Sequence, residues 1–122
     1  MPNPIDSLDR MLNFQSEALK LRSQRQELLA TNIANADTPQ YKAVDIDFGQ
    51  ALQQAVTPSG NDAAPAAQPT VLYRVPNQSS LDGNTVEMDV ERAQFADNTV
   101  RYEAALRVLN AQIKAMLIAL QG

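Results

Sequence analysis

The sequence contains no histidine, no cysteine and no tryptophan among its 122 residues. Without histidine the chain lacks the usual general base near neutral pH, and without cysteine it lacks thiolate nucleophiles and disulfides. The residue types on which most zinc sites depend are also missing. No serine lies in a G-x-S-x-G context or has a histidine partner, so a hydrolase triad is not expected. We therefore expect no catalytic residue, no metal site, no cofactor and no enzyme.

Basic clusters and long apolar runs are absent as well. The net charge is −4 and the pI is near 4.6, so nucleic acid and anionic membranes are poor partners, and no small-molecule substrate is expected. No stretch approaches the ~18 apolar residues that span a bilayer. The opening stretch, MPNPIDSLDRMLNF, has no basic region followed by an apolar core. We expect no cleaved signal peptide, and hence a chain that is cytoplasmic or exported with its N-terminus intact.

Residues 4–36 predict one long amphipathic helix. Neither glycine nor proline occurs from Ile5 to Asn35, and Asn3 or Asp6 is suited to cap the start. A seam with alternating spacings of three and four, typical of helices that pack lengthwise, runs along this segment and includes Arg25. Its apolar members, which we expect to serve in helix packing, are Met11, Phe14, Ala18, Leu21 and Leu28. The helix should end before Thr38-Pro39, because proline disfavours helical geometry in the residue that precedes it.

Residues 89–121 predict a second long helix, with Asp89 as a suitable cap. A seam with the same spacing passes through Thr99, and its expected packing residues are Phe95, Tyr102, Leu106, Leu109, Ile113, Met116 and Leu120. After Lys114 the sequence is apolar around the whole circumference of the helix. Such an end must be covered by something other than water.

The middle segment, residues 37–88, is predicted to be irregular and to contain short strands. Residues 44–48 alternate apolar side chains with Asp45 and Asp47, a period of two that is typical of a strand. Residues 51–69 are rich in Ala, Gln and Pro and are expected to form a poorly constrained excursion or linker, with a flexible linker at about 57–70. Residues 71–75 predict another strand, and Asp82-Gly83 indicates a turn. The fold class is therefore mainly α: two long terminal helices paired as a coiled-coil-like hairpin, with a short irregular, β-containing middle.

Several polar side chains have ordinary structural explanations. The EF-hand loop needs a glycine and a glutamate that the segment around Asp45 and Asp47 lacks, so a solvated acidic face is the better interpretation than a calcium site. Arg25 is expected to reach solvent or to pair with an acid on the neighbouring helix. The tyrosines are too scattered for a stacking platform and should pack with the hydroxyl at a wet edge.

Asn32 and Asn35 leave two interpretations open. Asn32 falls on the apolar seam, where an amide costs stability but can fix register, and Asn35 can satisfy the last helical carbonyls or take a left-handed cap. The other interpretation is a fraying, solvated helix end.

A motif spans this helix end and continues into the turn. Residues 30–41 read ATNIANADTPQY, and the residues that define the motif are Asn32, Ile33, Ala34, Asn35, Thr38, Pro39 and Tyr41. This motif resembles that of the bacterial flagellar rod and hook axial protein family. The stretches FQSEALKLRSQRQELLATNIANADTPQYKAVDIDF and MDVERAQFADNTVRYEAALRVLNAQIKAMLIAL are similar to the two ends of its proximal rod members. At Gln40 the family usually has glycine, which suggests a positive φ there.

The resemblance implies a structural subunit of the proximal rod of the flagellar basal body. In that family the terminal helices pair and pack into a helical tube that transmits torque, and the chain is exported uncleaved by the flagellar type III apparatus to the rod in the periplasmic space. The implied partners are further copies, other rod proteins, the adaptor FliE, the export gate and the MS-ring base. On this interpretation Asn32 and Asn35 tie the end of the first helix to the turn. The competing prediction is a cytoplasmic coiled-coil adaptor or export chaperone of a type III secretion system.

Overall fold

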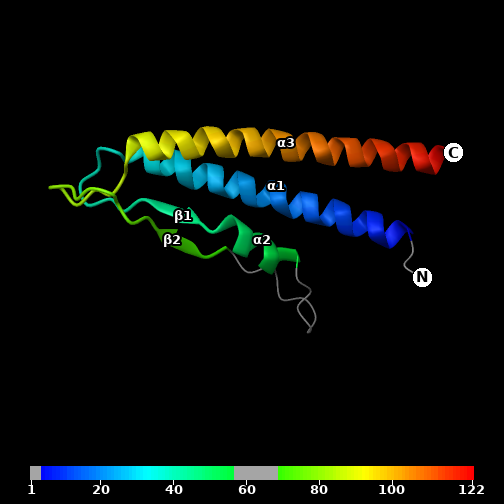
Figure 1. Cartoon of the computed structure of the whole chain (residues 1–122), viewed down its shortest axis with the longest axis horizontal. Coiled ribbons are helices and arrows are strands. Elements are labelled where there is room, and N and C mark those ends of the chain that lie inside the picture. Colours follow the sequence, from blue (N-terminus) through cyan, green and yellow to red (C-terminus); the bar gives the residue numbers. More distant parts are fainter. Residues whose placement is uncertain (1–3, 57–68) are drawn as a thin grey trace.

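The protein is built around two long antiparallel helices, which lie side by side in the computed structural model (Figure 1). The structure describes residues 4–56 and 69–122. Its elements in chain order are α1 (Pro4–Ala34), β1 (Val44–Ile46), α2 (Phe48–Val56), β2 (Val71–Tyr73) and α3 (Met88–Gln121). The expected fold class, a mainly helical hairpin with a short β-containing middle, is confirmed. The division into axial and middle segments as functional parts stays a prediction.

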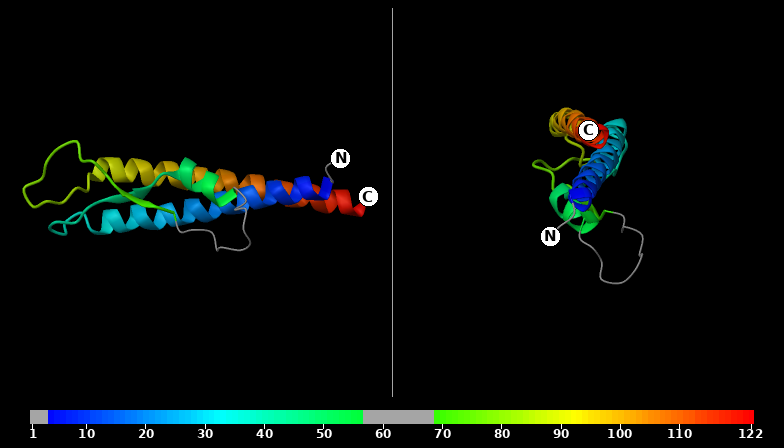
Figure 2. Two further views of the ribbon diagram at one scale, coloured as in Figure 1. Left: turned by 90° about the horizontal axis from the view of Figure 1, so that it is seen from below. Right: turned by 90° about the vertical axis from the view of Figure 1, so that its right-hand side faces the viewer.

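Helix α1 is the central element of the molecule. It packs against α3 on one side and against β1 and α2 on the other, so the middle segment folds back along α1 (Figures 1 and 2). Seen along its length, the molecule has α3, α1 and α2 as successive layers (Figure 2, right). Because α1 has neighbours on two sides while α3 packs mainly on α1, the outer face of α3 remains open.

The apolar core lies between α1 and the middle segment rather than between the two long helices. Leu21, Ile46 and Ala51 form its buried centre. The half-buried side chains that pack on this centre are Leu28, Phe48 and Leu52. The guanidinium of Arg22 lies 3.5 Å from the centroid of the Phe48 ring, a cation–π contact that closes one side of the core.

The strand prediction was right for Val44–Ile46 and wrong for Phe48. Strands β1 and β2 pair antiparallel, with Asp45 opposite Leu72. The chain leaves β1 at Asp47, whose side-chain Oδ1 accepts a hydrogen bond from the Gln50 N–H at 3.1 Å. This contact caps α2, so residues 51–56 are helical and not part of a linker. Residues 57–68 of the predicted linker lie outside the described residues.

The helix starts differ from the predicted caps. Helix α3 begins at Met88, and Glu87 occupies the cap position without a side-chain cap hydrogen bond. Asp89 lies in the first turn, where a carboxylate is favoured by the exposed N–H groups of the helix start. Asp6 likewise lies in the first turn of α1 rather than before it, and Asn3 lies outside the described residues.

Within the part of the chain that the structure describes, no helix combines the length and apolar character needed to cross a membrane.

Candidate functional site

Asn32 is the centre of the motif and is fully buried. Its Nδ2 donates to the Val44 carbonyl at 2.7 Å and to Glu91 Oε2 at 3.0 Å. Its Oδ1 accepts from the Val44 N–H and the Tyr41 hydroxyl, each at 3.1 Å. Burial of Tyr41, and next the negative charge of Glu91, raises the pKa of the tyrosine hydroxyl, which favours the protonated form that donates to Asn32. One amide therefore joins α1, β1 and α3, and this helix end is not frayed and solvated.

The end of α1 is closed by Asn35 and Asn84. Asn35 Nδ2 donates to the Thr31 carbonyl at 2.8 Å, and its Oδ1 accepts from the Thr38 hydroxyl at 3.0 Å. Asn84 arrives from 49 residues further along the chain, and its Nδ2 lies 2.7–3.0 Å from the carbonyl oxygens of Asn35, Ala36 and Thr38. Its own Oδ1 accepts from a backbone N–H two residues later, which holds the side chain in place. The orphan carbonyls of the helix end are thus satisfied by side chains.

Gln40 has a φ of 63°, so the turn keeps the left-handed geometry that a glycine would favour. Its backbone N–H donates to the Asp82 carbonyl at 2.8 Å. Gly83, with φ of 74°, lies directly against Gln40. The next contacts continue this pairing, because the Thr85 N–H donates to the Tyr41 carbonyl at 3.0 Å. The motif turn therefore rests on the Asp82-Gly83 turn that precedes α3.

Four charged side chains from four different parts of the fold meet beside Asn32. Arg25 of α1 donates to both carboxylate oxygens of Asp45 in β1, at 2.9 and 3.0 Å. Arg74, directly after β2, lies 2.7 Å from Asp45 and 2.6 Å from the fully buried Glu91 of α3. The hydrogen bond to Asp45 is the main cause that raises the pKa of Arg25. The cluster made by Arg25, Asp45, Arg74 and Glu91 is called the charge cluster below.

The charge cluster corrects two interpretations made from sequence. Asp45 is not on a solvated face, since its side chain is 15% exposed and is held by two arginines. Asp47 is exposed, as expected, and caps α2 instead. Arg25 pairs with an acid, but this acid lies on a strand rather than on the neighbouring helix, and α3 contributes Gln94, whose Oε1 accepts from Arg25 at 2.7 Å.

A second polar layer crosses the helix pair about two turns from Glu91. Asn98 is fully buried, and its Nδ2 donates to the Arg22 carbonyl at 2.9 Å and to Gln26 Oε1 at 2.7 Å. Gln26 in turn donates to the Thr99 hydroxyl at 2.7 Å. The two helices are therefore registered by amides and charges over this stretch, because each buried polar group has a partner at one relative position of the helices.

The residues of α3 that face α1 are not all the ones predicted. Part of the predicted seam is shifted by one residue from the side of the helix that is buried. Its least exposed column is polar or small and consists of Glu91, Asn98, Ala105 and Gln112. The predicted column beside it, which begins at Thr99, becomes exposed toward the far end: Leu106 is 38%, Ile113 41% and Leu120 73% exposed. The other predicted seam residues form a separate column, in which Phe95, Leu109 and Met116 are half-buried and Tyr102 is 36% exposed. A packing role for the exposed members stays a prediction about neighbours.

On α1 the predicted seam divides in the same way. Ala18 and Leu21 are buried and Leu28 is half-buried, whereas Met11 and Phe14 are 48% and 43% exposed. The motif residues divide too: Asn32 is buried, Ile33, Asn35 and Tyr41 are half-buried, and Ala34, Thr38 and Pro39 are exposed.

The two ends of the helix pair are therefore different. The corner end contains the motif turn, Asn84 and the charge cluster. The far end consists of residues 6–18 of α1 and 105–121 of α3, where Ala18 is the one residue of these ranges that is buried. The large apolar side chains exposed at the far end are Met11, Phe14, Leu106, Val108, Ile113, Leu117, Ile118 and Leu120. Exposed apolar side chains gathered in this way are typical of interaction surfaces.

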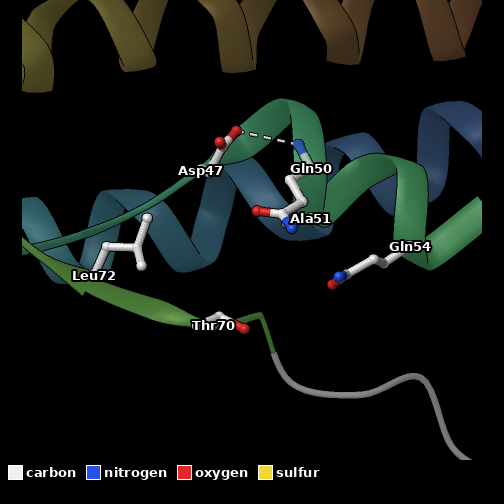
Figure 3. Close-up of a pocket in the computed structure, with 6 residues that line it drawn as sticks. All are labelled: Asp47, Gln50, Ala51, Gln54, Thr70 and Leu72. Carbon is white, nitrogen blue, oxygen red and sulfur yellow. Dashed lines mark hydrogen bonds between the residues drawn. The ribbon is translucent and has the colours of Figure 1, made fainter.

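One hollow of the middle segment is too small to hold a ligand. The hollow between α2 and the start of β2 is lined by Asp47, Gln50, Ala51, Gln54, Thr70 and Leu72 (Figure 3). Its volume is about 10 Å³, at or below the space that one water molecule needs. Within residues 4–56 and 69–122, no group of three or more acidic side chains is placed to hold a metal ion.

Sequence reasoning missed Asn84, Glu91 and Asn98. The spacing of seven between Glu91 and Asn98 is the one local signal that could have placed both on the seam. Asn84 has no such signal, since its acceptors lie 46 to 49 residues away.

Comparison with known proteins gives a consistent result. The family model described as "Flagella basal body rod protein" matches residues 12–42, which include the whole motif. The flagellar basal body rod protein FlgB of Salmonella typhimurium is 52% identical, with 97% of this chain and 98% of the relative covered. FlgB of Escherichia coli is 50% identical at the same coverage, and FlgB of Cereibacter sphaeroides is 48% identical over 91% of this chain and 94% of its own length. The chain belongs to the FlgB family of flagellar basal body rod proteins.

Proposed function

We propose that this chain is a structural subunit of the proximal rod of the bacterial flagellar basal body, and that it works by assembly. One observation carries the proposal: the far end exposes many large apolar side chains of α3, in a chain whose corner end is internally satisfied. Family membership supplies the kind of assembly, since the related proteins are named as basal body rod proteins. No catalytic step is part of this proposal.

The contacts between copies are proposed to be heterologous. In such a contact the outer face of α3 meets a different surface of the next copy, which yields an open helical array rather than a closed oligomer. The far end would lose its contact with water on incorporation, because burying its apolar side chains lowers the free energy of the array by about 25 cal/mol per Å². The corner end is formed before contact and holds the middle segment against α1.

The finer parts of the proposal come from the family. They are export by the flagellar type III apparatus without cleavage of a signal peptide, location in the periplasmic part of the rod, and contacts with FliE, the export gate and the MS-ring base. A cytoplasmic adaptor or chaperone is the less favoured alternative, because the relatives that cover nearly the whole chain are rod proteins.

The test is a charge placed on the far end. Ile118 is 66% exposed, so Ile118→Glu should leave the helicity of the isolated chain unchanged while rods fail to assemble and cells lose motility. Asn110→Glu places the same charge at an exposed polar position of α3 and is the matched control, for which we expect assembly to persist. Helicity is measured by circular dichroism, and assembly by electron microscopy of isolated basal bodies. Normal rods with Ile118→Glu would contradict the proposal.

A further inference from the structure

The charge cluster joins four separate parts of the fold and is electrically neutral as a whole. Its two acids and two bases come from α1, β1, the residue after β2, and α3, and their formal charges sum to zero. Removing one base therefore leaves the set with a net negative charge in a low-dielectric position. Such a set is stable only when all four parts are in place.

Glu91 is the member with the least freedom. Its side chain is 0% exposed, and it lies on the face of α3 that meets α1. Within the described residues, its ion pair is with Arg74, and its other polar contact is the Asn32 amide at 3.0 Å. A carboxylate buried without its counter-ion costs several kcal/mol, more than one neutral amide contact returns.

Arg74 is placed by the strand pair and not by either long helix. Its backbone N–H donates to the Ala43 carbonyl at 3.0 Å, and its Nη2 lies 2.7 Å from Asp45 of β1. If β2 were undocked, Arg74 would move away with it. Glu91 would then face α1 as an unpaired charge.

We infer that the charge cluster is a conformational lock, in which α1 and α3 close at the corner end only when β2 has docked and delivered Arg74 to Glu91. The middle segment thus controls the helix pair. In the undocked state Glu91 keeps its hydration, and the two helices stay apart at this end. The apolar core between α1 and the middle segment forms on the same side of α1 as β1, so docking of the strand pair and burial of Leu21 and Ile46 occur together.

The first test removes Arg74 from its ion pair with Glu91, and then also neutralises Glu91. Arg74→Gln should lower the equilibrium constant for closing by roughly 100-fold or more, because Glu91 is left buried and unpaired. Arg74→Gln combined with Glu91→Gln should recover most of this loss, since no unpaired charge remains. Arg101→Gln is the matched control: it breaks the exposed pair with Asp97, whose side chains are 59% and 51% exposed, and should change the constant by less than about 5-fold.

Closing is measured on the full chain as a distance between spin labels. The chain has no cysteine, so Ala30→Cys on α1 and Ala93→Cys on α3 give two exposed labelling positions at the corner end. A narrow, short distance is expected for the native sequence and a broad, longer one for Arg74→Gln. If Arg74→Gln also reduces overall helicity, recovery of both signals in the double variant decides for the lock. Failure to recover decides against it.

The second test separates a lock from a merely stabilising contact. Leu72→Pro disrupts β2, where Leu72 pairs with Asp45, without changing any charge. Leu72→Pro alone should open the helix pair. Leu72→Pro combined with Glu91→Gln should leave the pair closed. An unchanged distance with Glu91 present, or equal opening in both backgrounds, would overturn the inference.

Discussion

The corner end and the far end of the same helix pair use opposite means of holding a helix. At the corner end the buried polar groups are amides and charges with named partners. Asn32, Glu91 and Asn98 are fully buried there, beside the apolar Leu29 and Ala43. At the far end the side chains are apolar and remain exposed, such as Ile118 at 66% and Leu120 at 73%. Buried polar groups accept few arrangements, whereas apolar surface packs against many. The corner end is therefore suited to define one geometry, and the far end to bind neighbours.

The largest loss of stability is expected for Asn32→Ala at the corner end. The change removes four hydrogen bonds at once and leaves the Val44 amide and the Tyr41 hydroxyl without their partner. We expect a loss of about 2–4 kcal/mol in the free energy of unfolding. Urea denaturation followed by circular dichroism gives this value. Asn13→Ala, an exposed asparagine in the far part of the same helix, is the matched control and should cost less than about 0.5 kcal/mol.

The same site gives a cellular readout. Asn32→Ala combined with Asn35→Ala should impair motility while the chain is expressed at its normal level, because the turn that redirects the chain is no longer tied to α1. Normal rod assembly in that double variant, or equal costs for Asn32→Ala and Asn13→Ala, would remove the distinction between the two ends.

Substitution of Asn84 should cause an intermediate loss in the free energy of unfolding. Asn84→Ala removes the donor that serves three carbonyls at the end of α1, but these lie near solvent and water can replace part of the contact. The expected loss is about 1–2 kcal/mol by the same urea measurement. Asn77→Ala changes an exposed asparagine in the same connection between β2 and α3 and serves as the control. A cost at Asn84 no larger than at Asn77 would show that the turn before α3 does not support α1.

The far end was easier to predict from the sequence than the corner end. Alternating spacings of three and four predict both long helices, and the apolar circumference after Lys114 predicts an end that needs a cover. Both signals are local, because neighbouring turns of one helix define them. The break at Thr38-Pro39 and the polar Asn32 on the seam were also visible in the motif, although α1 ends at Ala34, four residues before Thr38.

The corner end could not be predicted in the same way, for two physical reasons. Its contacts join residues that are far apart in the chain, such as Asp45 with Arg25, 20 residues away, and with Arg74, 29 residues away. Several of its buried side chains are also polar, and hydrophobic periodicity does not reveal a buried polar side chain such as Glu91 or Asn98. Helix α2 was missed because Phe48 continues the alternation of β1, and only the capping role of Asp47 separates the two elements.

The smallest predicted effect concerns Gln40, where the corner holds a side chain in left-handed geometry. A residue with a Cβ pays roughly 1–2 kcal/mol for that conformation, and glycine loses roughly 0.5–1 kcal/mol more backbone entropy on folding. Gln40→Gly should therefore stabilise the chain by about 0.5–1 kcal/mol, measured as a higher urea midpoint with an unchanged slope. Gln40→Ala keeps the Cβ at a φ of 63° and should give no gain. If Gln40→Gly lowers the midpoint, the glutamine side chain stabilises the turn, and the corner end depends on a side chain at this position as well.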